Sequence, residues 1–303
     1  MKKVAFVGSK NLGFSVLEEV FRLAPDNLCC VITIDDSQDS RCALRSFSEF
    51  SKRTAKPLCI LSKGSELSNC ISEFAPDICL VVGWYWILKQ ELLEMVSEGW
   101  LGIHASLLPR YRGGSPLVWA IINGETESGV SLFYFDEGID TGDIVAQKKF
   151  EIGIDETIAD ILLKVEALSI KLIRETYSLL IDGKAPRVRQ DHSQATYVAL
   201  RNPADGHIDW HWSNIQIYNF VRGQTHPYPG AFAFMPSGEC LRIWKAKVFP
   251  YPYYGPPGKV VMAQNDHTVV TCGEGALSVY KVQIDGKQEV DSPEVLKFGM
   301  TLV

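Results

Sequence analysis

The stretch VAFVGSKNLG (residues 4–13) decides the fold class of the N-terminal part of this chain. A short apolar run, typical of a buried strand, leads through a turn of small and polar residues into a segment with helical spacing. The turn is not GxGxxG and lacks the Gly-Lys-Ser/Thr ending of a phosphate loop, so neither nucleotide fingerprint applies. Two interpretations stay open: a plain strand-to-helix turn, or a turn at the carboxyl edge of a sheet where Ser9 and Lys10 contact a substrate.

Strand and helix patterns alternate from this stretch to about residue 185. Further strands are predicted at 29–34, 58–61, 78–84, 100–104, 130–135 and 144–150, with helices near 12–23, 41–54, 66–74, 89–96 and 116–123. A last, long helix is predicted to be capped by Asp155 and to end at Gly183. This alternation is typical of the α/β class, with a Rossmann-like, mostly parallel sheet and helices on both of its faces.

The pattern changes near residue 200, where a turn-rich segment is followed by one helix and then by short strands broken by proline and glycine. We therefore predict an α/β domain over residues 1–200, followed by a linker and a smaller antiparallel β domain over 201–303. Three roles for the small domain stay open: it forms a homodimer, binds a second ligand, or shields one edge of the sheet.

Composition narrows the class of protein. The formal net charge is −6, which gives no support to broad binding of nucleic acid or of an anionic membrane. No apolar run reaches the roughly 18 residues of a membrane span. The eight cysteines contain no CxxC pair and no histidine at zinc spacing, so we expect buried thiols, no metal site and a cytoplasmic location.

His104 is the first candidate for chemistry, within GIHASLLPRYRGG (residues 102–114). It ends a predicted strand, where ligands of open α/β sheets bind. The acidic, glycine-rich loop DEGIDTGD (136–143) follows another strand, and by composition alone it would be a solvated turn. A carboxylate from this loop can hold one imidazole nitrogen and leave the other as a base. A third candidate, GWYWIL (83–88), either packs a flat heterocycle or covers a domain interface.

These segments resemble the folate-dependent formyltransferases. The likeness is carried by HASLLPRYRGGSP (104–116) and GETESGVSLFYFDEGIDTGDIVAQ (124–147). Further along, RNPADGHIDW (201–210) and HPYPGAFAFMPSGECLRIWKAKV (226–248) are similar to the linker and the OB-like β domain of methionyl-tRNA formyltransferase and its relatives. The resemblance covers nearly the whole chain.

The resemblance implies that a primary amine attacks the formyl carbon of N10-formyltetrahydrofolate. His104 would be the general base and Asp140 would orient it. Segments that match folate-holding segments of the family supply the candidate folate contacts, which are Trp84, Tyr85, Trp86, Ile87, Leu88, Asp136, Gly138 and Ile139. The cosubstrate needs no metal.

Gly102 departs from the family motif, which has an asparagine at this position that donates to the developing oxyanion. Such a donor is worth about 10²–10³ in rate. Three explanations stay open. Another donor replaces it, such as a backbone N–H, an ordered water or the side chain of Ser106; the glycine makes room for a bulkier acceptor; or the protein is a slow or inactive relative.

The acceptor amine is predicted from charge. Residues 204–303 hold eight Lys and Arg against nine Asp and Glu, and the segment DDSQD (35–39) is acidic where the tRNA enzyme carries a basic loop. The motifs also look closer to the branch that formylates amino sugars on nucleotide carriers, for surface glycan synthesis. We therefore expect a nucleotide-linked amino sugar, with Lys10, Arg110 and Arg112 as candidate phosphate contacts. The alternatives are methionyl-tRNA, hydrolysis of formyltetrahydrofolate, or folate binding without turnover.

Overall fold

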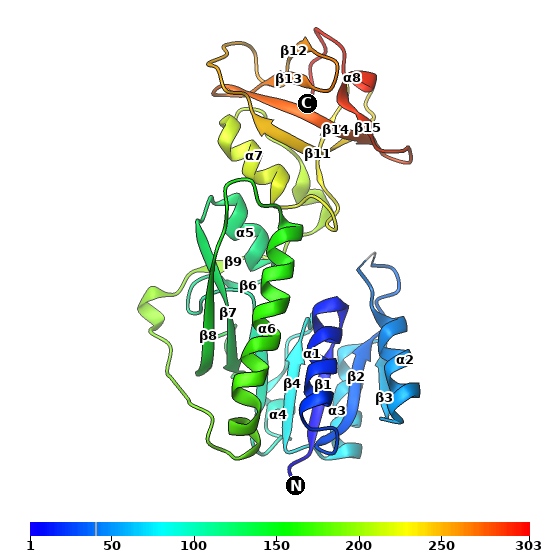
Figure 1. Cartoon of the computed structure of the whole chain (residues 1–303), viewed down its shortest axis with the longest axis vertical. Helices are drawn as coiled ribbons and strands as arrows, with labels where there is room; N and C mark the ends of the chain where they lie inside the picture. Colours follow the sequence, from blue (N-terminus) through cyan, green and yellow to red (C-terminus); the bar gives the residue numbers. More distant parts are fainter. Residues whose placement is uncertain (40) are drawn as a thin grey trace. The chain divides into compact units, whose positions relative to one another are not determined.

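A computed structural model describes residues 1–39 and 41–303 of the chain (Figure 1). It divides into two compact units that interleave along the sequence. The first holds residues 1–113, 128–150 and 163–198, and the second holds 114–127, 151–162 and 199–303. The division of the chain into domains at residue 200 remains a prediction.

The first unit is built on a seven-stranded sheet in the order β3-β2-β1-β4-β5-β7-β8. The strands are β1 (Val4–Gly8), β2 (Leu28–Ile34), β3 (Leu58–Leu61), β4 (Ile78–Val82), β5 (Trp100–His104), β7 (Glu127–Tyr134) and β8 (Ile144–Glu151). Strands β1 to β5 pair in parallel, and β7 pairs antiparallel with β5. The predicted α/β class with a mostly parallel sheet is therefore confirmed.

Alternate residues of the buried strands point to opposite faces of the sheet. On one face, Ala5 and Val7 join a core cluster with residues of α3 (Leu67–Phe74) and with Leu88. On the other face, Phe6 packs against Phe47 of α2 (Leu44–Thr54), which in turn meets Phe14 of α1 (Lys10–Leu23). The helices therefore cover both faces, as the alternation of strand and helix predicts.

The second unit contains an antiparallel sheet in the order β10-β11-β14-β13-β12, with β15 paired to β14. Its elements are α5 (Pro116–Ile122), α7 (Asn214–Arg222), β10 (Ala231–Phe234), β11 (Cys240–Val248), β12 (Val260–Ala263), β13 (Thr268–Thr271), β14 (Ala276–Ile284), β15 (Val290–Asp291) and α8 (Ser292–Val295). Strand β11 alternates buried Leu241 and Ile243 with more exposed neighbours, because one face of this sheet packs on a core. This confirms the predicted antiparallel β region.

One predicted helix start is wrong. The long helix α6 (Ile158–Ile181) begins after Thr157, whose backbone N–H donates to Asp160 at 2.8 Å. Asp155 lies outside the helix, and its carboxylate accepts a hydrogen bond from the Tyr218 hydroxyl at 2.9 Å. The local pattern Thr157-Ile158-Ala159-Asp160, with Asp160 reaching back to the N–H of Thr157, marks the start of the helix instead. In the part of the chain that the structure describes, no helix has the length and apolar character that a membrane crossing requires.

Glu19 of α1 is a buried carboxylate whose pKa gives an acid-stability prediction. Hydrogen bonds from Arg22 and from Arg174 of α6 lower the pKa of Glu19 from 4.5 to about 2. A lowered pKa in the folded state stabilises the fold above about pH 4.5, and this contribution is lost as the pH falls toward about 2. We expect Glu19→Gln to lower the free energy of unfolding at pH 7 and to flatten its dependence on pH in this window. Urea titrations of both proteins between pH 2 and 7 would measure this, and parallel pH profiles would contradict the assignment.

Candidate active site

His104 is the last residue of β5 and lies at the carboxyl edge of the parallel strands, where it is 8% exposed. Each of its two ring nitrogens lies near an oxygen atom of another residue. The Nε2 atom lies 2.7 Å from the carbonyl oxygen of Tyr111, and the Nδ1 atom lies 3.6 Å from Oδ2 of Asp140. A carbonyl oxygen only accepts hydrogen bonds, so Nε2 must carry the proton. This leaves Nδ1 as the basic nitrogen, and it faces the Asp140 carboxylate.

The orienting group differs from the one expected from the sequence. Asp140 was predicted to hold the imidazole, but a separation of 3.6 Å is too long for a hydrogen bond. The Tyr111 carbonyl holds the ring instead, and Asp140 lies where its negative charge would stabilise a protonated ring. Tyr111 and Asp140 both have left-handed backbones, with φ of 58° and 53°. Such conformations are uncommon outside glycine and concentrate at functional sites.

Asp140 is fixed from two sides. Its Oδ2 atom accepts a hydrogen bond from the backbone N–H of Gly113 at 2.7 Å, and its own carbonyl accepts one from the Gln190 side chain at 2.9 Å. Gly113 has a φ of 99° and its backbone runs close to the Val198 carbonyl, so a side chain there would be both strained and crowded. The Arg112-Gly113-Gly114 turn of the segment 102–114, called the signature loop below, therefore supplies a backbone donor to the acidic loop 136–143.

Gly102 lies on β5 two residues before His104, and its side-chain space is already filled. A Cβ atom built there would lie 2.8 Å from Cζ of Phe135 and 3.2 Å from Cε1 of Phe133. Phe133 and Phe135 are themselves in contact, with ring centroids 5.0 Å apart. The glycine therefore accommodates aromatic rings of this chain, and the space is not left for a bulkier acceptor.

Ser106 does not lie as its predicted role requires. Strand β5 ends at His104, so the alternation that would put Ser106 on the same face stops before it. Its hydroxyl is buried and donates to the Arg110 carbonyl at 2.6 Å, and its own carbonyl accepts from Ser131 at 2.7 Å. These contacts engage the hydroxyl proton inside the loop, where it is unavailable to an oxyanion.

The aromatic segment after β4 divides into an inward and an outward set. Trp84 and Trp86 meet edge to face, with centroids 5.1 Å apart, and pack against the core of the first unit with the buried Leu88. Tyr85 is 46% exposed and Ile87 is 85% exposed. The outward pair therefore presents more apolar surface than the partly buried Trp84 and Trp86.

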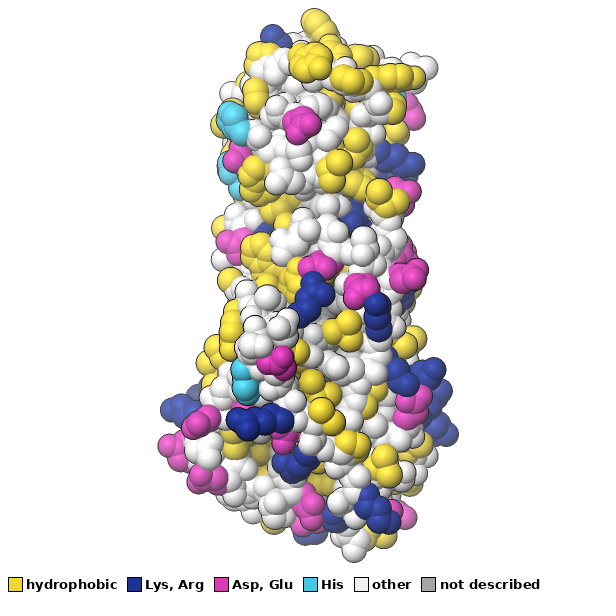
Figure 2. Space-filling model, turned by 90° about the vertical axis from the view of Figure 1, so that its left-hand side faces the viewer, with side chains coloured by type: hydrophobic (Ala, Val, Ile, Leu, Met, Phe, Trp, Pro, Cys, Tyr) yellow, Lys and Arg dark blue, Asp and Glu magenta, His cyan; other side chains and the backbone are white. Residues whose placement is uncertain are grey.

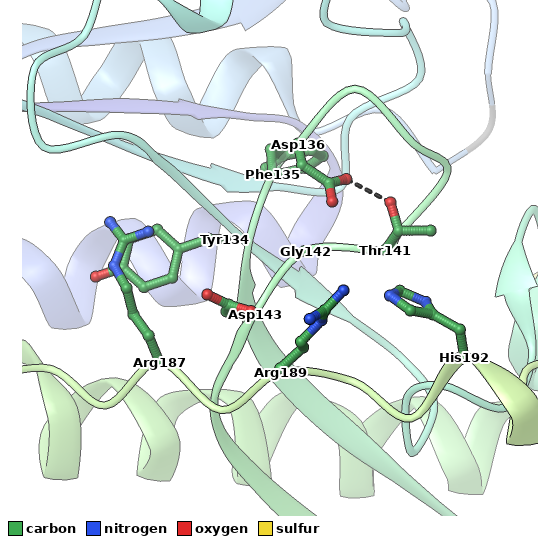
Figure 3. Close-up of a pocket in the computed structure, with 9 residues that line it drawn as sticks. All are labelled: Tyr134, Phe135, Asp136, Thr141, Gly142, Asp143, Arg187, Arg189 and His192. Carbon is green, nitrogen blue, oxygen red and sulfur yellow. Dashed lines mark hydrogen bonds between the residues drawn. The ribbon is translucent and has the colours of Figure 1, made fainter.

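The acidic loop that carries Asp140 is held by its own residues. Asp136 accepts hydrogen bonds from the Gly138 backbone at 3.1 Å and from the Thr141 hydroxyl at 2.5 Å, while Ile139 at its tip is 56% exposed. Figure 3 shows the Asp136–Thr141 contact. The loop therefore has a defined shape before any ligand binds.

Two hollows adjoin this loop and share Phe135 and Asp136. One, of about 250 Å³, is lined by Tyr134, Phe135, Asp136, Thr141, Gly142, Asp143, Arg187, Arg189 and His192 (Figure 3). The other, of about 440 Å³, is lined by Gln90, Leu93, Glu94, Phe135, Asp136 and Glu137. Polar and charged side chains line both hollows.

The predicted cationic contacts are placed differently from one another. Lys10 forms ion pairs with Asp36 at 2.5 Å and Asp39 at 2.8 Å. Burial by itself would lower the pKa of Lys10, but hydrogen bonds with these two carboxylates outweigh it and raise the pKa above its usual value. Two of the three aspartates in the segment 35–39 are therefore ion-pair partners of Lys10. Ser9 is also internal, since its hydroxyl donates to the Gly83 carbonyl at 2.5 Å and ties the ends of β1 and β4 together.

Arg110 is exposed, and its guanidinium lies 5.8 Å from the ring centroid of Tyr111. Arg112 is 1% exposed and donates to Gln190 and Tyr197. The donors of Arg112 are used inside the protein, and Arg110 is the exposed one of these two arginines.

Sequence reasoning missed several residues of the site. Two of them, the Tyr111 carbonyl and the Gly113 N–H, contribute backbone groups, which side-chain motifs do not record. The third, the Gln190 side chain, comes from a segment with no motif. The sequence did indicate Phe135 as a residue near the site, because it directly precedes the acidic loop. It also lies two positions after Phe133, so a strand would place both rings on the same face.

Comparison with known proteins assigns the family. A model of the formyl transferase family matches residues 30–176, and a model of the formyl transferase C-terminal domain matches residues 201–298. A methionyl-tRNA formyltransferase of Sorangium cellulosum is 38% identical over 239 residues, which are 78% of this chain and 76% of that protein. The chain therefore belongs to the formyl transferase family, an enzyme family, which confirms the resemblance seen in its motifs.

Solved structures share the fold at lower identity. The sugar 3N-formyltransferase WlaRD, crystallised with dTDP and 5-N-formyl-THF, has a TM-score of 0.69 at 20% identity and covers 95% of this chain and 99% of its own. An N-formyltransferase of Helicobacter canadensis, in complex with folinic acid and dTDP-3-aminofucose, has a TM-score of 0.68 at 20% identity and covers 92% and 99%.

Proposed function

We propose that this protein transfers the formyl group of N10-formyltetrahydrofolate to the primary amine of a nucleotide-linked amino sugar. The observation that carries the proposal is the pairing of a basic imidazole nitrogen with a carboxylate at the carboxyl edge of the sheet, His104 Nδ1 beside Asp140. An amine must lose a proton as it attacks a formyl carbon, and an unprotonated imidazole nitrogen beside it is suited to take that proton.

The contacts of His104 give each group a role in this step. The Nε2–H bond to the Tyr111 carbonyl keeps the ring in the tautomer whose Nδ1 lone pair is free. The amine nitrogen forms a bond to the formyl carbon while its proton passes to Nδ1. Asp140 then stabilises the imidazolium, which returns the proton to N10 as the N10–formyl bond breaks, so that tetrahydrofolate is released and the neutral imidazole is restored. The exposed Tyr85 and Ile87, with the loop 136–140, are the proposed folate contacts.

Surface charge supports a small acceptor. On the face shown in Figure 2, Lys and Arg side chains are interspersed with Asp and Glu. A protein that neutralises many phosphates of a nucleic acid needs clustered cations. The exposed Arg110 is the proposed contact for the phosphates of a nucleotide carrier.

Methionyl-tRNA is the second candidate acceptor, and one observation favours it. The curated relatives at 31–38% identity are methionyl-tRNA formyltransferases, and some of them match 97% of this chain. The same His104–Asp140 chemistry serves this amine, so the two candidates differ only in how the rest of the acceptor is bound.

The test is a turnover assay with N10-formyltetrahydrofolate. The purified protein would be offered nucleotide-linked amino sugars in one series and charged initiator methionyl-tRNA in another, with product mass and tetrahydrofolate release followed together. A formylated sugar nucleotide supports the proposal, and formyl-methionyl-tRNA alone overturns it in favour of the second candidate. Release without a formylated acceptor would show hydrolysis, and donor binding without release would show an inactive relative.

A further inference from the structure

Gln190 connects the two loops of the site from a segment that carries no motif. Its side chain is 4% exposed. The Nε2 group donates to the Asp140 carbonyl at 2.9 Å and to the Gly142 carbonyl at 2.7 Å, so it spans the turn that follows Asp140. Both donor hydrogens of the amide are therefore committed to the backbone of the acidic loop.

The other end of the same amide meets the signature loop. Oε1 of Gln190 accepts from Nη2 of Arg112 at 2.6 Å and from Nε at 3.2 Å. Arg112 is 1% exposed, and its remaining contacts are the Tyr197 hydroxyl at 2.9 Å and Nδ1 of His192 at 3.0 Å. A buried guanidinium whose acceptors are neutral is costly to leave unsatisfied, which fixes the Gln190 amide in one orientation.

The two links converge on the carboxylate beside His104. Arg112 is followed by Gly113, whose N–H donates to the Asp140 carboxylate, and Gln190 holds the carbonyl of the same aspartate. Asp140 needs this support because its backbone has a φ of 53°, a left-handed conformation that persists in a residue other than glycine only when the surroundings hold it.

We propose that Gln190 is a positioning residue for the formyl-transfer reaction, acting with Arg112 to keep the Asp140 carboxylate beside His104 Nδ1. The proposal rests on the proposed function for its effect on turnover, and on the structure alone for its effect on Asp140. Neither residue touches the reacting atoms in this scheme. Their effect is on the geometry of the base, and a misplacement of about 1 Å in such a site can cost about 10²-fold in rate.

The decisive variant is Gln190→Glu. A carboxylate at this position keeps the acceptor for Arg112 and gains an ion pair with it, so the loop stays anchored on that side. It loses both N–H donors, and its charge repels the carbonyls of Asp140 and Gly142. The contact with Arg112 would therefore be preserved, whereas the contacts that position Asp140 would be lost.

Two readouts follow. Hydrogen exchange at the Gly113 amide, which is bonded to Asp140, is expected to become at least about tenfold faster in Gln190→Glu. With the acceptor identified by the turnover assay, kcat is expected to fall by about 10²-fold with unchanged KM for both substrates, while the melting temperature falls less than in Gln190→Ala because Arg112 keeps its acceptor. Gln190→Ala should show the same loss of kcat together with a lower melting temperature, because Arg112 loses its acceptor.

The matched control is Gln283→Glu, the same substitution at an amide that links Trp244 to Lys287 in the second unit. It should change neither readout. Unchanged exchange at Gly113 in Gln190→Glu overturns the proposal even if no acceptor is ever formylated, since this measurement needs no substrate. Faster exchange with unchanged kcat overturns it as well, because Asp140 would then be displaced without consequence.

Discussion

His104→Gln is expected to lower kcat by about 10²–10⁴-fold, the usual contribution of a general base. Glutamine retains an N–H that can reach the Tyr111 carbonyl, so the loop contact at 2.7 Å has a replacement. What it lacks is the basic nitrogen that faces Asp140. The measurement is initial rate against pH with the acceptor identified by the turnover assay, together with the melting temperature.

The control for this variant is His211→Gln. His211 also pairs with an aspartate, Asp209, through Nδ1 at 3.0 Å, but it is exposed and belongs to the second unit. We expect full activity in this protein. A His104→Gln protein with near wild-type kcat would remove the imidazole from the mechanism and leave Asp140 without a partner in catalysis.

Gly102→Asn is expected to reduce stability and activity, although it restores the residue of the resembled motif. The new side chain would meet the Phe135 ring, whose Cζ lies 2.8 Å from the position of its Cβ. Overpacking of this kind typically costs about 1–3 kcal/mol. Displacement of Phe135 would also move the loop that begins at Asp136, so kcat should fall with the free energy of unfolding.

The double variant Gly102→Asn/Phe135→Ala tests whether the ring is the cause. Removing the ring opens the space for the asparagine, so the loss of unfolding free energy should be smaller than the sum of the two single losses. A coupling of about 0.5–3 kcal/mol is typical for residues in contact. Urea denaturation of the four proteins gives this coupling, and additive losses would show that Phe135 and position 102 are independent.

Much of the fold follows from local pattern. The alternation of strand and helix to residue 185 predicted each of the strands β1 to β5 to within a few residues, because a buried parallel strand reads as an apolar run and its helix as an amphipathic one. The predicted start of helix α6 at Asp155 is wrong because Thr157 and Asp160 form the local contacts at the start, while the Asp155 carboxylate binds Tyr218, 63 positions away. Pairing across such a distance leaves no trace in a local window.

For the site, the sequence by itself predicted the residues that the proposed mechanism uses, His104 at a strand end and Asp140 in a glycine-rich loop, and its motifs indicated membership of the formyl transferase family. The tertiary structure decided how these residues are placed. A backbone carbonyl, that of Tyr111, orients His104, and the Phe135 ring fills the space beside Gly102. Arg112 and Ser106 donate to hydrogen-bond acceptors inside the protein. Motifs record side-chain identity, whereas backbone donors, ring packing and burial depend on which distant segments the fold brings together.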